Sequence, residues 1–109
     1  MNTLKIASTS KASAAAGAVA NTIREEGIAE LQAIGPKAVN QAIKSIAIAR
    51  GYVAPSGLDL FFVPSFVDVE IGEETKTALR FTVRSRTPVT SLRPRTRKGG
   101  APPETWENI

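Results

Sequence analysis

A strictly alternating segment near the end of the chain most constrains the fold. From residue 76 to residue 84, mostly apolar side chains alternate with mostly charged ones, as in a β-strand whose two faces meet different surroundings. One face would be Thr77, Leu79, Phe81 and Val83, and the other Lys76, Ala78, Arg80 and Arg84. Such a strand needs a second layer of structure over its apolar face, so we expect a sheet covered on one side.

The first third of the chain indicates a strand followed by a helix. Thr3 to Ala7 alternates apolar and polar residues, and Ser8-Thr9-Ser10 is a cluster of helix-capping residues. The Ala-rich segment from Lys11 to Glu26 then carries an apolar stripe at helical spacing, formed by Ala12, Ala16, Val19 and Ile23. We expect a closely packed helix that ends at Gly27.

A second strand and helix follow. Residues 28–34 are largely apolar and predict a buried strand, and Gly35-Pro36 is typical of a helix start. The helix should extend to about Arg50. Counted at 100° per residue, its core face would be Val39, Ala42, Ile43, Ile46 and Ala47, with Lys37, Gln41, Lys44 and Ile48 on the opposite side.

The remaining apolar residues predict a hairpin. Residues 58–71 form a long strand in which Pro64 removes one hydrogen-bond donor, so this strand is either at the sheet edge or bulged there. Gly72-Glu73-Glu74 turns the chain into the alternating strand described above. The element order is therefore βαβαββ, in a domain covering residues 1–84. Residues 85–109 are rich in proline and arginine, and we expect them to be a flexible basic tail.

Charge and composition narrow the chemistry. Of the formal charge of +4 over 109 residues, residues 1–84 contribute +1 (nine basic, eight acidic) and residues 85–109 contribute +3 (five basic, two acidic). Because the chain has no His and no Cys, it can form neither a disulfide nor a thiolate or imidazole metal site, nor a Ser-His pair. We expect no enzyme activity, cofactor, metal or small-molecule substrate. No membrane span or signal peptide is visible, which favours a cytoplasmic protein.

The segment AIGPKAVNQAIKSIAIARGYVAPSG at residues 33–57, followed by LDLFFVPSFVDVEI, resembles the bacterial stage V sporulation protein S family. The N-terminal KIASTSKASAAAGAVANTIREEG is also similar to that family. The resemblance implies an Alba-like α/β (α+β) fold, a two-layer sandwich with a mixed four-stranded sheet and two helices on one face. It also implies self-association, nucleic-acid binding by analogy to Alba chromatin proteins, and a part in spore development.

Two features depart from the Alba pattern. Alba proteins extend a basic hairpin along DNA, whereas this turn is Gly72-Glu73-Glu74, near Asp68 and Glu70. Phosphate would repel such a hairpin. The second departure is the tail at residues 85–109, which lies outside the resemblance.

Basic residues near the second predicted helix are the candidate nucleic-acid site. Residues 31–58 contain no acid, and the resemblance places the binding surface in this neighbourhood. The alternative is that these lysines only solvate an exposed helix face. In the tail, four clustered basic residues would bind phosphates without reading sequence, or would form only a solubilising linker. The predicted nucleic-acid-binding set is Lys11, Lys37, Asn40, Gln41, Lys44, Arg50, Arg93, Arg95, Arg97 and Lys98.

Self-association is the other expectation. By the helical count, Ile48 lies opposite the core face and should not contact the core of its own subunit, and the strand after residue 58 is rich in Phe. A domain of this size also buries only about 60–65% of the surface of its unfolded chain, a smaller share than larger domains bury. We therefore expect a homodimer or higher oligomer with Ile48, Phe61 and Phe62 in its interface. A self-assembling or protein-interaction module without a nucleic-acid role remains the alternative function.

Overall fold

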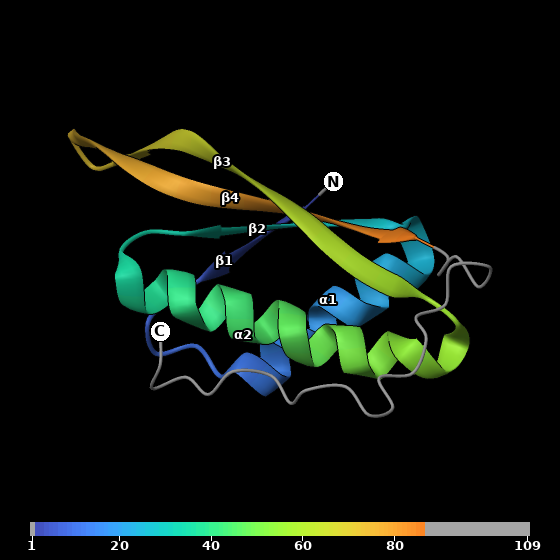
Figure 1. Ribbon diagram of the computed structural model, residues 1–109. Coiled ribbons are helices and arrows are strands. Elements are labelled where there is room, and N and C mark those ends of the chain that lie inside the picture. The colour runs from blue at the N-terminus through green and yellow to red at the C-terminus, as the bar shows by residue number, and fades with distance from the viewer. Residues whose placement is uncertain (1, 87–109) are drawn as a thin grey trace, which may run out of the picture.

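The structure is a computed structural model that describes residues 2–86. The order of elements is βαβαββ with one short 3-10 turn, as the sequence predicts (Figure 1). The elements are β1 (Thr3–Ile6), α1 (Ala12–Glu26), β2 (Ile28–Ala33), α2 (Pro36–Val53), η1 (Ala54–Ser56), β3 (Asp59–Ile71) and β4 (Glu74–Arg86). The predicted tail lies outside the described residues except for its first two, which complete β4.

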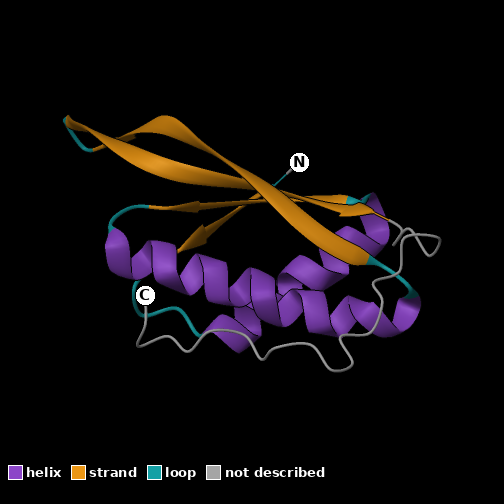
Figure 2. Cartoon of the chain, viewed as in Figure 1, coloured by secondary structure: helices purple, strands orange, loops and turns teal. Residues whose placement is uncertain are grey.

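The four strands form one mixed sheet in the order β1-β2-β4-β3. β1 and β2 are parallel, whereas β4 is antiparallel to both β2 and β3. Both helices lie on the same side of this sheet (Figure 2). The fold is thus an α+β sandwich of two layers, in agreement with the expectation.

The core lies between the sheet and the helices and is built largely from small side chains. In α1, Ala16 and Ala20 are buried, and in α2, Ala42 and Ala49 are buried, so the two helices approach closely. From the sheet, Leu31, Phe81 and Val83 complete this core. Phe81 meets the ring of Phe62 edge to face, with 5.3 Å between centroids.

The predicted core face of α2 is partly wrong. Ala42 and Ile46 are buried as expected, but Ile43 and Ala47 are exposed. The reason is that α2 packs against α1 as well as against the sheet, which rotates its buried stripe toward the α1 side. The buried residues of α2 are Ala38, Ala42, Ser45, Ile46, Ala49 and Val53. The helix ends at Val53, three residues later than predicted.

The structure also tests the predictions for the serine cluster before α1 and for Pro64. The cluster Ser8-Thr9-Ser10 does not cap α1: the backbone N–H of Ala7 donates to Ser10 Oγ, and Lys11 occupies the capping position without a side-chain bond. Pro64 lies in the edge strand β3, and the β3–β4 register is unbroken from Asp59 to Ile71. The edge-strand reading is therefore correct, and the bulge is absent.

The β3–β4 hairpin is longer than its neighbours. The last pair between β2 and β4 joins Ala33 to Leu79, so residues 67–78 pair only with each other. We call this segment the hairpin arm; it projects beyond β2 in Figure 1. Its charged residues are Asp68, Glu70, Glu73, Glu74 and Lys76, so the arm is acidic.

Candidate nucleic-acid interface

The starts of the two helices lie beside each other. The side-chain amide of Gln41, in the second turn of α2, donates a hydrogen bond of 2.7 Å to the backbone carbonyl of Ser10, just before α1. Ser8, Pro36, Lys37, Asn40 and Gln41 line a hollow of about 350 Å³ at this junction. Ser10 and Gln41, which are 31 positions apart in the chain, thus share one surface.

Three lysines lie on or next to the two helices that meet here, and one of them, Lys37, lines the hollow. Lys11 follows Ser10 directly, and Lys37 and Lys44 lie seven residues apart on α2, which places them on one helix face with Asn40. All four side chains are exposed, whereas Gln41 is half-buried by its bond to Ser10. We call Lys11, Lys37, Asn40, Gln41 and Lys44 the helix-start surface. It unites five of the predicted binding residues.

The backbone reinforces the positive charge of the helix-start surface. Neither helix has a side-chain cap at its start, and neither has an acidic residue in its first turn. The first amide N–H groups of α1 and α2 therefore have no carboxylate competing for them, and the positive ends of both helix dipoles lie at this surface. Such helix starts favour anions such as phosphate.

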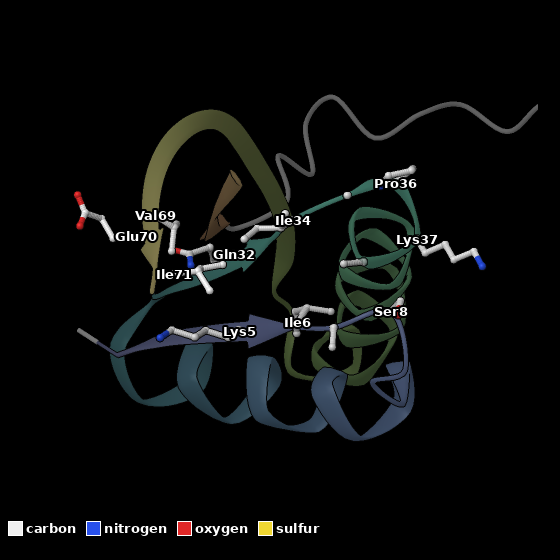
Figure 3. A pocket seen from close by; sticks show the side chains of 13 residues that line it. Lys5, Ile6, Ser8, Gln32, Ile34, Pro36, Lys37, Val69, Glu70 and Ile71 are labelled. Atoms are coloured by element: carbon white, nitrogen blue, oxygen red, sulfur yellow. The ribbon is translucent and has the colours of Figure 1, made fainter. Parts of the chain in front are cut away.

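An apolar cavity of about 670 Å³ also adjoins the start of α2 and shares Ser8, Pro36 and Lys37 with the hollow. Ile6, Ile34, Val69 and Ile71 line it, together with Gln32 (Figure 3). In Figure 3, Lys37 and Glu70 extend away from it in opposite directions. The hairpin arm forms one wall, so the acidic side chain of Glu70 is kept on the far side from Lys37.

Arg50 lies apart from this surface. It is thirteen residues beyond Lys37, about 20 Å along the helix axis. Its Nε bonds Asp59 Oδ1 at 2.6 Å, and Arg86 Nε approaches Asp59 Oδ2 at 3.3 Å. The hydrogen bond from Arg50, more than that from Arg86, lowers the pKa of Asp59. The arginines thus anchor the start of β3.

The three predicted interface residues have different surroundings. Ile48 is partly buried and packs against the core, so the expectation that it makes no core contact is wrong. The rotation of α2 described above is the cause. Phe62 also packs on the core, whereas Phe61 lies on the other face of β3 and is 36% exposed. The cause is that successive side chains of a strand point to opposite faces, so residues 61 and 62 lie on opposite sides of the sheet.

Two exposed apolar residues were missed by sequence reasoning. Phe66 is 78% exposed and Ile43 is 42% exposed. Phe66 lines a hollow of about 330 Å³ together with Pro36, Val39 and Leu79. The helical count assigned Ile43 to the core face, and the sequence did not predict that Phe66 would be more exposed than the other apolar residues of its strand. Phe66 lies on the helix-facing side of β3 beside the start of α2, and its exposure depends on how far α2 extends over β3, which no local sequence pattern shows.

Comparison with known proteins identifies the family. The sequence matches Stage V sporulation protein S (SpoVS) over residues 2–86, which is every residue that the structure describes. The chain belongs to the SpoVS family. The SpoVS match and β4 both end at Arg86.

The SpoVS chain also resembles a solved structure, Alba from Thermoplasma volcanium. The TM-score is 0.52 at 10% sequence identity, and the similarity covers 77% of this chain and 98% of that one. At this identity the likeness shows the fold alone, so the fold is Alba-like. None of the described helices is both long and apolar enough to cross a membrane. Within residues 2–86, no three potential metal-ligating side chains come together.

Proposed function

We propose that this SpoVS protein is a cytoplasmic, regulatory nucleic-acid-binding protein that contacts phosphates through the helix-start surface and the basic residues Arg93, Arg95, Arg97 and Lys98. The observation that carries the proposal is the junction of two uncapped helix starts with Lys11, Lys37 and Lys44 around them. The four tail residues lie outside the described part of the chain. No catalytic role is assigned.

The helix-start surface would work by charge and position. Lysines neutralise phosphates and release counterions, and Asn40 would donate hydrogen bonds to backbone oxygens. These contacts orient a nucleic acid without reading its bases. The acidic hairpin arm would be kept away from the phosphates, so binding would differ from the basic-hairpin mode attributed above to Alba proteins. Arg50 remains a predicted contact but is occupied by Asp59.

Charge reversal tests the proposal. The double variant Lys37→Glu with Lys44→Glu should lose most duplex binding in a full-length protein, measured by fluorescence anisotropy across a salt series. The matched control, Lys76→Glu with Arg24→Glu, makes the same change of net charge away from this surface. For the unchanged protein, the logarithm of affinity should fall with the logarithm of salt by about 0.9 per phosphate contacted.

The outcomes of this test are separable. Equal binding by both double variants would remove the helix-start surface from the proposal. A truncation after Arg86, compared in the same titration, would show how much of the affinity the tail residues supply. Thermal melting of each variant distinguishes lost binding from lost folding.

Self-association is a second candidate function, favoured by a different observation. Phe66 is the most exposed of the large apolar side chains described, and it borders the apolar hollow with Pro36, Val39 and Leu79. A second copy could cover this surface and the neighbouring Ile43. In that arrangement the protein would be a homodimer or larger assembly, with an interface centred on Phe66 rather than on Ile48 and Phe62.

A further inference from the structure

The sheet face opposite the helices has no covering element within residues 2–86 (Figure 2). Register and burial decide which side chains occupy it. Leu79, Phe81 and Val83 of β4 point toward the helices, so the residues between them point the other way. We call this side the open sheet face. Its members on β3, β4 and β2 include Phe61, Val63, Ser65, Arg80, Thr82, Arg84, Arg86, Ile28, Glu30 and Gln32.

Phe61 lies on the open sheet face and is not among the residues that pack in or against the core. It is 36% exposed, while its neighbour Phe62 makes the core contact with Phe81. Phe61 pairs directly with Arg84 on β4, and the Arg86 guanidinium lies 5.5 Å from the centre of its ring. The Phe61 ring is therefore partly exposed on this face, with the Arg86 guanidinium over it and Arg84 opposite it on β4. Val63, two residues further along β3, is 55% exposed on the same face.

The arginines of the open sheet face differ in whether a carboxylate pairs with them. Arg80 pairs with Glu30 at 3.2 Å, and Arg86 uses its Nε for Asp59. Arg84 is exposed and forms no ion pair with the described residues. A guanidinium has five N–H donors, so Arg86 also keeps donors beyond the one that contacts Asp59. The neighbourhood of Phe61 thus carries unused positive charge.

We propose that the open sheet face is a second nucleic-acid-binding surface, in which Phe61 stacks on an unpaired base while Arg84 and Arg86 contact the adjoining phosphates. The occupant is single-stranded DNA or RNA, because stacking requires a base face that a duplex hides within its own helix. The inference extends the proposed function to another face of the molecule, and it uses no residue of the helix-start surface.

Charge complementarity favours a nucleic acid over a second copy of this chain. A symmetric contact through the open sheet face would bring Arg84 and Arg86 against a surface bearing the same arginines, which is unfavourable. A polyanion instead gains from each of them. An exposed aromatic ring on an uncovered sheet face is also the element that sheet-based single-strand binders use.

The experiment measures anisotropy of labelled oligothymidine and oligouridine of equal length, with a duplex of that length as comparison, on the full chain. Phe61→Leu keeps an apolar side chain but removes the stacking surface. We expect it to weaken single-strand binding by about fivefold or more and to leave duplex binding unchanged. Phe61→Trp should restore binding, which a merely structural effect of residue 61 would not produce.

Arginine variants provide the electrostatic part of the test. Arg84→Gln should lower the salt slope for single strands by about 0.7, the value for one phosphate contact. Lys76→Gln removes the same charge from the same strand and should not change binding of either oligonucleotide. Comparing the titrations with oligothymidine and oligouridine shows whether the protein prefers single-stranded DNA or single-stranded RNA.

Several results would overturn this inference. Absence of single-strand binding by the unchanged protein would do so, as would equal affinity of the protein and Phe61→Leu. Self-association lost in Arg84→Gln without any change in single-strand binding would assign the face to a second copy. The proposed function fails separately, because its test is duplex binding by the Lys37→Glu, Lys44→Glu variant.

Discussion

The side chain of Gln41 reaches the backbone carbonyl of Ser10 at 2.7 Å and thereby fixes the start of α2 beside the start of α1. Removing it in Gln41→Ala should lower the free energy of unfolding by about 1 kcal/mol, because a half-buried carbonyl loses its donor. Urea denaturation measures this change. Asn40→Ala is the control: Asn40 is exposed one residue away, and its change should be within about 0.5 kcal/mol. An equal effect of both substitutions would contradict the assigned role of Gln41.

The close contact of the helices predicts a size limit at Ala42. This residue is fully buried in α2, where α1 and the sheet converge. Ala42→Leu should destabilise the domain by about 1–3 kcal/mol through overpacking, seen as a lower melting temperature. Ala47→Leu makes the same change on the exposed side of the same helix and should be nearly neutral. A stable Ala42→Leu variant would mean that the interface has more space than the structure shows.

The ion cluster around Asp59 predicts an acid-dependent loss of stability. Arg50 first, and Arg86 second, hold the pKa of Asp59 below its ordinary value near 4. A depressed folded-state pKa contributes stability above the unfolded-state pKa, and this contribution is lost as pH falls through the folded value. Both arginines are mostly exposed, so we expect about 1 kcal/mol or less at neutral pH.

Asp59→Asn isolates that contribution. At pH 7 the variant should be less stable than the unchanged protein, and the two stabilities should converge at a pH well below 4. Asp68→Asn, which removes a carboxylate of the hairpin arm that pairs with no described basic residue, provides the comparison. A constant difference between Asp59→Asn and the parent at every pH would exclude the ion cluster as its source.

Exposed Phe66 predicts concentration-dependent association. If a second copy covers it, Phe66→Asp should shift the protein toward monomer in sedimentation velocity, with the melting temperature nearly unchanged. Phe66 is 78% exposed within one subunit, so its replacement costs little core packing. Val63→Asp, on the opposite face of the same strand, is the matched control. A protein that is monomeric at all concentrations would remove the self-association candidate.

Local patterns in the sequence were enough to predict the order of elements. Alternation predicted the two faces of β4 from Leu79 to Arg84, although Thr77 is exposed and Ala78 is buried, the reverse of the expectation. Gly35-Pro36 placed the start of α2 correctly. The hydrophobic periods of two residues in a strand and 3.6 in a helix belong to each element by itself. They can therefore be recognised without knowing how the elements pack together. The resemblance to the SpoVS family supplied the Alba-like arrangement of those elements.

What escaped prediction depends on contacts between elements. Ile43 and Ile48 were placed on the wrong sides because the rotation of α2 is decided by its packing against α1. Lys11 joins Lys37 and Lys44 only through the fold, and Ser10 bonds backward to Ala7 instead of capping α1. Phe61 and Phe62 could have been separated by strand alternation alone.

Pro64 has a consequence for the behaviour of the protein at high concentration. β3 is a thirteen-residue edge strand whose outer side pairs with no described strand, and such an edge can recruit further chains into growing aggregates. Because proline offers no N–H, it interrupts any incoming ladder near the middle of that edge. Pro64 therefore weakens the addition of a further strand at this edge, and a residue with an ordinary amide at position 64 would remove that protection.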